Sequence, residues 1–435
     1  MVEKDDILFS LRAWGKGLVN SPPAEIGALL RLVRQHRESG EGLADLDGLL
    51  REVGFAIVAG LYEGIAQSVL NRGYQGAVRE VHGQPQRFVG HREKTYRTLL
   101  GPVPVQRAAY EGEGRLHFPL DEILGVNRRG WTQRLEALAV EAGVERDFRG
   151  AGRWLALAGI PTHATSVWRV CNRAGAAVRE REEQKMGAPT PASRKVPGVL
   201  AVEADGFKVN TEEGWKEILA GLVGRVPPGN NPERLVEKTY VATFHERGEF
   251  WAKLQSQALA RGWARARSRL FLSDGSHSLQ EDARVVFGDA EMILDFYHAV
   301  EHLGGVAEKV FGPEHPAGRR WVAEQRHRLR RSQGERLIAA LRRLAPTGRT
   351  AHRACSEQVE YFSRNLERTR YLRFRRRGWP IGSGAIEGAG KHLITTRFKG
   401  NGRKWKVASL RNLLALRIHV FNHRDHPTLA LRNVA

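Results

Sequence analysis

Two aspartates stand where strands of the chain are expected to end, and together they could bind a divalent cation. Asp205 ends one strand-like run in Glu203-Ala-Asp-Gly206, and Asp274 ends another in Ser273-Asp-Gly275. Because the mouths of neighbouring central strands in a mixed sheet lie a few ångströms apart, two acids there can share one ion. An Asp-Gly pair alone also suits an ordinary turn, so the prediction depends on the two positions taken jointly.

Glu387 is a third candidate ligand, in Gly382-Ser-Gly-Ala-Ile-Glu-Gly388 at the start of an expected helix. Two interpretations stay open. As an acid in the first helical turn it would offset the helix dipole, with Gly384 as cap and Glu387 at the third helical position. As a metal ligand it would explain why an acid stands in a basic stretch, because residues 361–411 hold fourteen Lys and Arg and only two acids.

Aromatic residues interleave the basic ones of that stretch, in Arg370–Trp379 and Arg397–Trp405. Cationic side chains neutralise phosphates, and aromatic rings stack on unpaired bases. We therefore predict contacts with nucleic acid here, with a solvated charged helix as the alternative. The predicted DNA-binding residues are Arg375, Arg376, Arg377, Lys391, Arg397, Lys399, Arg403, Lys404 and Trp405.

Asp295 and two histidines form a further group near an expected fifth strand. We predict that Asp295 contacts the metal ligands and does not itself bind the metal. The alternative is that Asp295, in place of Asp274, is the second metal-binding carboxylate. His298 and His302, in His298-Ala-Val-Glu-His302, fall on one face of a helix and are predicted to have the same supporting role. Their spacing also fits an inverted zinc-peptidase pattern, but nothing else in the sequence indicates a peptidase.

The elements that must position these residues follow a definite order after residue 197. Three consecutive strands, then helix, strand, helix and strand is the order of a ribonuclease-H-like core. From His298 to about Tyr371 the pattern is helical and charged, and it is long enough to be an inserted subdomain. The expected strands cover residues 199–209, 218–226, 239–244, 270–274 and 292–297, with helices over 250–264 and 279–287.

The sequence therefore predicts a multidomain protein with an α/β ribonuclease-H-like core and an all-α insertion. Two runs around Gly101-Pro102 predict a β-hairpin, and helices over 147–158 and 162–177 fit either a helix-turn-helix or an ordinary helical pair. The predicted domains are a helical N-terminal region (1–90), a β-hairpin region (91–127), a helix-turn-helix-like DNA-binding region (128–188), a linker (189–197), the first part of the core (198–300), the helical insertion (301–378), and the final core helix with a basic C-terminal region (379–435).

Composition narrows the partner to a polyanion. The 435 residues include 69 Lys and Arg against 48 Asp and Glu, a formal charge of +21, which favours DNA or RNA as partner. Apolar runs fall short of the ~20 residues of a membrane span, and no secretory signal opens the chain. We expect a cytoplasmic, nucleoid-associated bacterial protein. The two cysteines, Cys171 and Cys355, exclude a disulfide framework and a thiolate zinc finger.

Four motifs give the sequence a family resemblance: Ala204–Val209, Leu272–Gly275, Ile293–Leu303, and Trp379–Glu387 with Lys391. They resemble bacterial insertion-sequence transposases of the ISKra type, relatives of the Mutator-like superfamily with a DDE site. The resemblance covers about residues 94–417. It implies Asp205, Asp274 and Glu387 as metal ligands. Many relatives carry a Cys pair after the hairpin tyrosine, whereas here Tyr110 is followed by Glu-Gly-Glu-Gly-Arg.

The resemblance implies a transposase that binds the terminal repeats of its element, cuts the double-stranded DNA there and joins the 3′ hydroxyls to target DNA. Mg²⁺, with Mn²⁺ as a substitute, would be held by the three carboxylates, with Asp205 bridging two ions. Holding two DNA ends implies a homodimer or larger assembly. Two other functions stay open: a metal-dependent nuclease or resolvase that cuts without joining, and a non-catalytic DNA-binding descendant.

Overall fold

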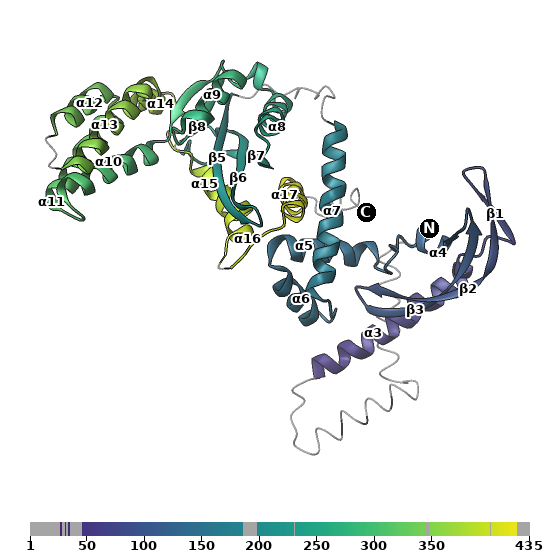
Figure 1. The fold of residues 1–435 in the computed structure, drawn as a ribbon. Helices are drawn as coiled ribbons and strands as arrows, with labels where there is room; N and C mark the ends of the chain where they lie inside the picture. The colour runs from purple at the N-terminus through teal and green to yellow at the C-terminus, as the bar shows by residue number, and fades with distance from the viewer. Residues whose placement is uncertain are drawn as a thin grey trace. The chain divides into compact units, whose positions relative to one another are not determined.

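The computed structural model describes Gly27, Arg31, Arg34 and residues 46–185, 198–229, 231–344, 348–400 and 402–423 (Figure 1). The chain divides into two compact units, residues 1–135 and 136–435. Each unit contains a β-sheet with helices, so the predicted multidomain α/β class is confirmed. The predicted linker at 189–197 lies outside the described residues. No helix in the described ranges combines the length and the apolar character needed to cross a bilayer.

The first unit is built on a four-stranded antiparallel sheet in the order β1-β2-β3-β4. The expected hairpin is present, and its turn uses Gly101 at φ +103°, a conformation that favours glycine. The sheet begins at Val78, well before the predicted boundary at residue 91, because polar residues of 78–90 mask the strand pattern. Its elements are α3 (Leu46–Gly64), a π-helical turn (Ile65–Val69), a 3-10 turn (Asn71–Gly73), β1 (Val78–Val81), β2 (Gln84–Thr98), β3 (Gly101–Gly112), β4 (Arg115–His117) and α4 (Pro119–Ile123).

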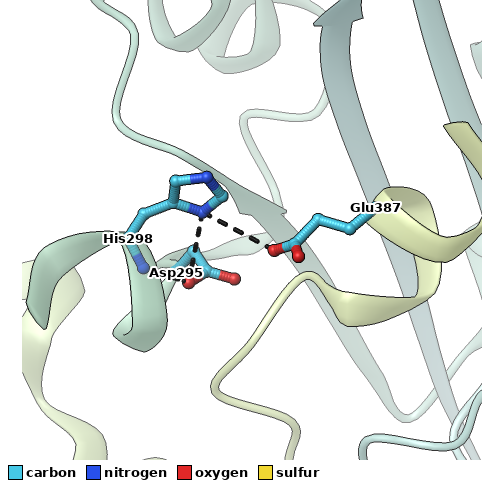
Figure 2. A group of neighbouring side chains, drawn as sticks. All are labelled: Asp295, His298 and Glu387. Carbon is cyan, nitrogen blue, oxygen red and sulfur yellow. Dashed lines mark hydrogen bonds and ion pairs between the residues drawn. The ribbon is translucent and has the colours of Figure 1, made fainter. Parts of the chain in front are cut away.

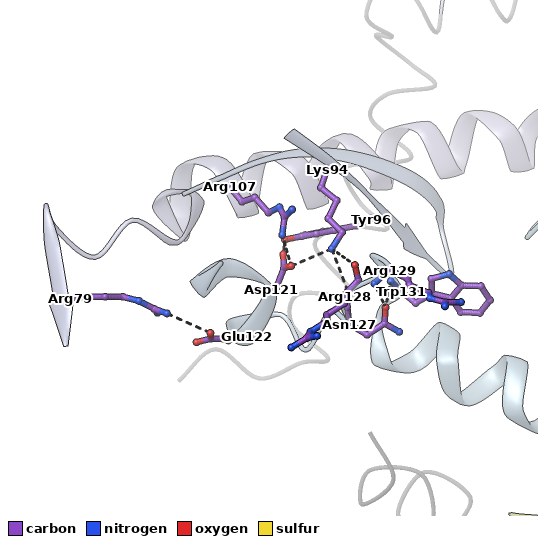
Figure 3. A network of polar contacts seen from close by, with 10 residues as sticks. All are labelled: Arg79, Lys94, Tyr96, Arg107, Asp121, Glu122, Asn127, Arg128, Arg129 and Trp131. Carbon is purple, nitrogen blue, oxygen red and sulfur yellow. Dashed lines mark hydrogen bonds and ion pairs between the residues drawn. The ribbon is translucent and has the colours of Figure 1, made fainter. Parts of the chain in front are cut away.

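A polar network centred on Asp121 ties α4 to the hairpin of the first unit (Figure 3). The Asp121 carboxylate lies 2.5 Å from Nη1 of the buried Arg107 and 3.4 Å from Nζ of Lys94. It also accepts a hydrogen bond from the Tyr96 hydroxyl. Lys94 in turn donates to the Arg128 carbonyl at 3.0 Å. The Asp121 carboxylate therefore balances the charges of two cations. One of them, Lys94, also holds the loop that follows α4.

The second unit carries a five-stranded mixed sheet in the order β7-β6-β5-β8-β9, with β7, β6 and β5 antiparallel and β5, β8 and β9 parallel. Its elements are α5 (Gln133–Glu145), α6 (Phe148–Leu157), α7 (Ala164–Lys185), β5 (Val199–Thr211), β6 (Gly214–Arg225), β7 (Val236–Phe244), α8 (Arg247–Ala260), a 3-10 turn (Trp263–Arg265), β8 (Ser268–Ser273), α9 (His277–Val286), β9 (Glu291–Leu294), α10 (Phe296–Phe311), α11 (Pro316–Arg330), α12 (Gly334–Arg343), α13 (Arg349–Arg364), a 3-10 turn (Leu366–Thr369), α14 (Tyr371–Arg376), α15 (Gly384–Gly390), a π-helical turn (Lys391–Thr395), α16 (Thr396–Phe398) and α17 (Val407–Asn422).

Helices cover both faces of this sheet. Val202 and Ala204 of β5 point to one face, where they join Phe250 of α8 and Leu279 of α9 in a hydrophobic core. Side chains alternate along a strand, so Glu203 of β5 points to the opposite face. That face carries α15 and α17, which come from the C-terminal part of the chain (Figure 1). The helices α10 to α14 form the expected helical insertion between β9 and α15.

The helices before the linker belong to the second unit, because α7 packs along α17. The closest approach is at Gly175, where a Cβ would lie 2.1 Å from the Asn412 carbonyl oxygen. Two buried arginines add to this junction: Arg397 donates to the Gly143 carbonyl at 3.1 Å, and Arg417 donates to the Val144 carbonyl. The two arginines donate hydrogen bonds to carbonyl groups in the last turn of α5, which have no partners within the helix.

We expect Gly175→Ala to destabilise the second unit by about 1–3 kcal/mol, because the added methyl group meets backbone that cannot rotate away. Gly305→Ala in α10 is the matched control, since a Cβ there meets nothing within 4 Å. This control should be neutral or stabilising by up to about 1 kcal/mol, as expected for glycine to alanine within a helix. Calorimetric unfolding of the three proteins measures the difference, and equal midpoints for the two variants would contradict the close packing of α7 on α17.

Candidate functional site

Asp205 and Asp274 lie side by side at one end of the parallel strands. The parallel pairing of β5 with β8 ends at Glu203 opposite Leu272, so each aspartate stands two residues beyond that pair. Neighbouring strands of a sheet are about 4.8 Å apart, so the two carboxylates lie together where the parallel pairing of β5 and β8 ends, a place called the strand mouth below. One expectation needs correction: Asp205 does not end its strand, because β5 continues to Thr211 in its hairpin with β6.

The helix α15 lies over the face of β5 that carries Asp205. Near its start, the Ile386 N–H donates to Glu203 Oε2 at 2.7 Å. At its end, Gly390 touches the ring of Phe207, and a Cβ there would come within 2.0 Å of the ring. Glu203, Asp205 and Phe207 share one face of the strand, since they are spaced by two residues. Asp205 thus lies between the two contacts, below the turn that carries Glu387.

Glu387 meets Asp295 and His298 at the start of α10 (Figure 2). His298 Nδ1 lies 3.4 Å from Asp295 Oδ1 and 3.6 Å from Glu387 Oε1. One possible ligand atom from each of the three residues falls within 4.8 Å of the others. Asp295 does not lie on the fifth strand as expected. The strand β9 ends at Leu294, and Asp295 caps α10 by accepting the His298 N–H at 2.7 Å.

The charges of these residues act on one another across the strand mouth. Burial, together with the nearby Asp274 and Glu387 carboxylates, raises the pKa of Asp205 to about 6. Burial and the charge of Asp295 raise the pKa of Glu387. Polar contact with Asp295 and the charge of Glu387 raise the pKa of His298 to about 9. The excess of carboxylates favours a cation at this place.

The geometry supports one part of the capping interpretation of Glu387: it is an acid in the first turn of α15, where it offsets the helix dipole, but it does not form a capping box. In a capping box the third helical residue accepts the N–H of the residue that caps the helix. Here Ser383 is the cap and Glu387 is the fourth helical residue. The Ser383 N–H and hydroxyl both donate to Asp295. The Glu387 side chain is about half exposed and lies beside both His298 and the Ser383 side chain.

The helical insertion holds Asp274 from its other side. The Tyr361 hydroxyl of α13 donates to the Asp274 carbonyl at 2.9 Å, and the His302 ring stacks on the Tyr361 ring at a centroid distance of 4.3 Å. The buried Arg368 donates to Ser273 Oγ at 2.9 Å and to the Ile293 carbonyl. His302 therefore contacts an aromatic ring and does not join His298 in the ligand group found among the described residues, contrary to the zinc-peptidase alternative.

Three carboxylates accept backbone N–H groups from the segment 381–386, which leads into Glu387, and sequence reasoning missed two of them, Glu203 and Glu233. Glu233 accepts from Ile381 at 3.0 Å and from Gly382 at 3.1 Å, Asp295 accepts from Ser383, and Glu203 accepts from Ile386. Burial raises the pKa of Glu203 to about 8. One signal was visible in the sequence: Glu203 interrupts the otherwise apolar run Val199–Ala204.

The predicted DNA-binding residues divide into two groups. Arg397 is 2 % exposed and does not lie on the surface where we expected it. Arg403 donates to the Arg397 carbonyl at 2.9 Å, and the Trp405 indole donates to the Phe398 carbonyl at 3.0 Å, so both hold the backbone around α16. The other six are exposed: Arg375, Arg376, Arg377, Lys391, Lys399 and Lys404.

The fold and the site define a multidomain α/β protein with carboxylates and a histidine gathered at one end of its second sheet. Residues 79–430 match the family described as Uncharacterised protein family (UPF0236), and the chain belongs to this family. No curated protein matches the chain. Among solved structures the chain is similar to the Drosophila P element transposase strand transfer complex, at 9% identity and a TM-score of 0.27, covering 70% of this chain and 83% of that chain. A TM-score this low transfers neither a fold nor a function.

Proposed function

We propose that the protein is a DNA transposase of the DDE type, which cuts DNA at the ends of its element and joins the freed 3′ hydroxyls to target DNA. The observation that carries the proposal is the position of Asp205, which stands beside Asp274 where the pairing of β5 with β8 ends and under α15, the helix that carries Glu387. Phosphoryl transfer by metal ions requires such a cluster, because the ions must be held next to the scissile phosphate.

The sheet supports a ribonuclease-H-like core within this proposal. Three antiparallel strands are followed in the sheet by two parallel ones, in the order β7-β6-β5-β8-β9. This arrangement puts the C-terminal end of β8 next to the middle of β5, where Asp205 lies, at the centre of the sheet. A helical insertion then separates Asp274 from the helix that carries Glu387.

The donor set suits Mg²⁺ or Mn²⁺. Hard divalent cations prefer carboxylate oxygens, and Asp205, Asp274 and Glu387 supply them. Bound ions would supply the activation of the attacking hydroxyl and the stabilisation of the leaving oxygen. Asp295 stays ionised: burial opposes it, but hydrogen bonds from His298 and Ser383 hold the pKa of Asp295 below its usual value. Asp295 thereby orients His298 beside Glu387.

Double-stranded DNA is the proposed partner. The exposed cations Arg375, Arg376, Arg377 and Lys391 lie before and after Glu387 in the sequence, and Lys391 is one helical turn beyond it. These residues would bind phosphates, so DNA affinity should fall steeply with salt. Two element ends have to be held together for joining, and a homodimer or larger assembly is part of the proposal. The reaction would take place in the bacterial cytoplasm.

The test is to incubate the protein with its own flanking genomic DNA in Mg²⁺ and to sequence the products. We expect 3′ ends cut at the element boundary and then joined to target DNA, with no product in EDTA. Asp205→Asn should lose at least ~10³-fold in cutting, since a residue that would hold the metal loses its charge while the fold is kept. Lys309→Gln, an exposed change in α10, serves as the control.

Two outcomes would contradict the proposal in different ways. Ends that are cut but never joined would identify a metal-dependent nuclease or resolvase. DNA that is bound but left uncut by the wild type, with Asp205→Asn behaving identically, would identify a non-catalytic DNA-binding protein.

A further inference from the structure

We infer that Glu203 and Glu233 are positioning residues, which fix the segment 381–386, made of the loop 381–383 and the first turn of α15, and thereby set the place of Glu387 beside Asp205. The inference rests on the proposed function, because Glu387 matters there as a ligand. Neither glutamate was predicted from the sequence as part of the site. Both act through hydrogen bonds to backbone, so their effect on the reaction is indirect.

Glu233 binds the loop with both of its carboxylate oxygens. Oε1 accepts the Ile381 N–H at 3.0 Å, and Oε2 accepts the Gly382 N–H at 3.1 Å. Two consecutive N–H groups pointing at one carboxylate fix the direction of the chain as well as its position. The loop fits tightly here, because a Cβ on Gly382 would come within 2.7 Å of the Tyr297 ring. Glu233 thus holds the loop against α10.

Glu203 holds the other end of the segment. Its side chain is fully buried, and Oε2 accepts the Ile386 N–H, which is shared with the Ser383 carbonyl. Oε1 has no hydrogen-bond partner among the described residues. Burying such a carboxyl opposes folding, and an apolar side chain of similar size would pack there more favourably. Packing therefore does not explain why a carboxyl is buried here. The hydrogen bond that Glu203 accepts from Ile386, the residue just before Glu387, does explain it.

The two contacts bracket the segment that leads into Glu387. Glu233 fixes residues 381 and 382, Asp295 fixes Ser383, and Glu203 fixes Ile386. Glu387 is the next residue, and its own N–H donates to the Ser383 carbonyl at 3.2 Å. A displacement of about 1 Å in a catalytic group can lower a rate by roughly 100-fold. Loss of either glutamate should therefore slow the reaction without removing a ligand.

The experiment compares Glu233→Ala and Glu203→Leu with the wild type in the full chain. Hydrogen exchange reports on the segment directly: we expect exchange of the Ile381 and Gly382 amides to rise at least ~10-fold in Glu233→Ala, and that of Ile386 in Glu203→Leu. Single-turnover DNA cleavage in Mg²⁺ should slow by ~10- to 100-fold in each variant, with DNA affinity changed less than ~2-fold. Binding of Mn²⁺ alone should weaken by ~10-fold.

Two further variants separate positioning from folding. Glu203→Gln keeps a carbonyl acceptor for Ile386, so it should restore protection of the segment and cleavage to within ~3-fold of the wild type. Glu213→Ala, at the exposed tip of the β5–β6 hairpin, removes a glutamate that does not touch the segment and should leave all three measurements unchanged. Circular dichroism checks that every variant is folded. If Glu203→Leu does not fold, Glu233→Ala alone carries the test.

The outcomes distinguish this inference from the proposed function. Wild-type protein that cuts DNA, with both variants cutting equally fast, would overturn the positioning role and leave the proposed function standing. Wild-type protein that neither binds Mn²⁺ nor cuts would overturn the proposed function. Exchange at residues 381, 382 and 386 would then decide by itself whether the two glutamates fix the segment.

Discussion

Replacing Glu387 by Gln should reduce DNA cleavage by on the order of 10³-fold, equivalent to about 4 kcal/mol of transition-state stabilisation. The amide keeps the shape of the side chain but removes the charge that faces His298 at 3.6 Å. A neutral ligand binds Mg²⁺ poorly, so the reaction should fail although the fold is kept. Rates of cleavage in Mg²⁺ and the unfolding midpoint of the same preparation together measure the effect.

The unfolding measurement decides between the two interpretations of Glu387. A metal ligand that is half exposed should leave stability within about 0.5 kcal/mol of the wild type when it is neutralised. A helix-capping acid would instead cost stability and spare cleavage. Glu308→Gln, an exposed acid on α10, is the control and should alter neither quantity. Retained cleavage in Glu387→Gln would remove Glu387 from the proposed trio.

Asp121→Ala should destabilise the first unit by about 3–5 kcal/mol, because it leaves the buried guanidinium of Arg107 without its partner. The side chain of Arg107 is only 9% exposed, and water cannot take over the role of the carboxylate there. The change also removes the acceptor of the Tyr96 hydroxyl and the partner of Lys94. Trypsin digestion of the full chain, followed by mass spectrometry, should show early cleavage within β2 and β3.

Two companion variants test the reason for this loss. Glu122→Ala removes the adjacent acid, whose side chain is 63% exposed and pairs with Arg79 at 3.6 Å, and should cost less than about 1 kcal/mol. The double variant Asp121→Ala with Arg107→Met removes both charges and should recover much of the lost stability. If the double variant is no more stable than Asp121→Ala, the unpaired guanidinium is not the cause.

Local sequence patterns predicted most elements of the second unit correctly. Runs of β-branched and apolar residues marked β5 to β9, since buried strands have few other compositions. The start of the first sheet was missed because Val78–Val81 alternates charged and apolar residues over only four positions. The packing of α7 on α17 could not be predicted, because it joins helices that lie more than two hundred residues apart in the chain.

The residues of the site could be predicted only where the neighbouring residues in the sequence indicate their role. Asp205 follows the apolar first half of β5 and Asp274 follows β8, and their adjacency follows from strand order. Glu203 and Glu233 were missed because their partners are backbone N–H groups more than a hundred residues away. Arg397 was assigned to the surface by its charge, whereas a helix end in another segment supplies the carbonyl that makes its burial possible.

The contact between α7 and α17 has a consequence for protein synthesis. The helix α7 emerges from the ribosome before any strand of the second sheet, but the surface that covers it is the last described helix of the chain. Translation proceeds at about 5–20 residues per second, so roughly ten seconds or more pass between the synthesis of α7 and that of α17. During that interval Gly175 and its neighbours form an uncovered surface, so a chaperone that binds nascent chains should contact α7 until α17 has been translated.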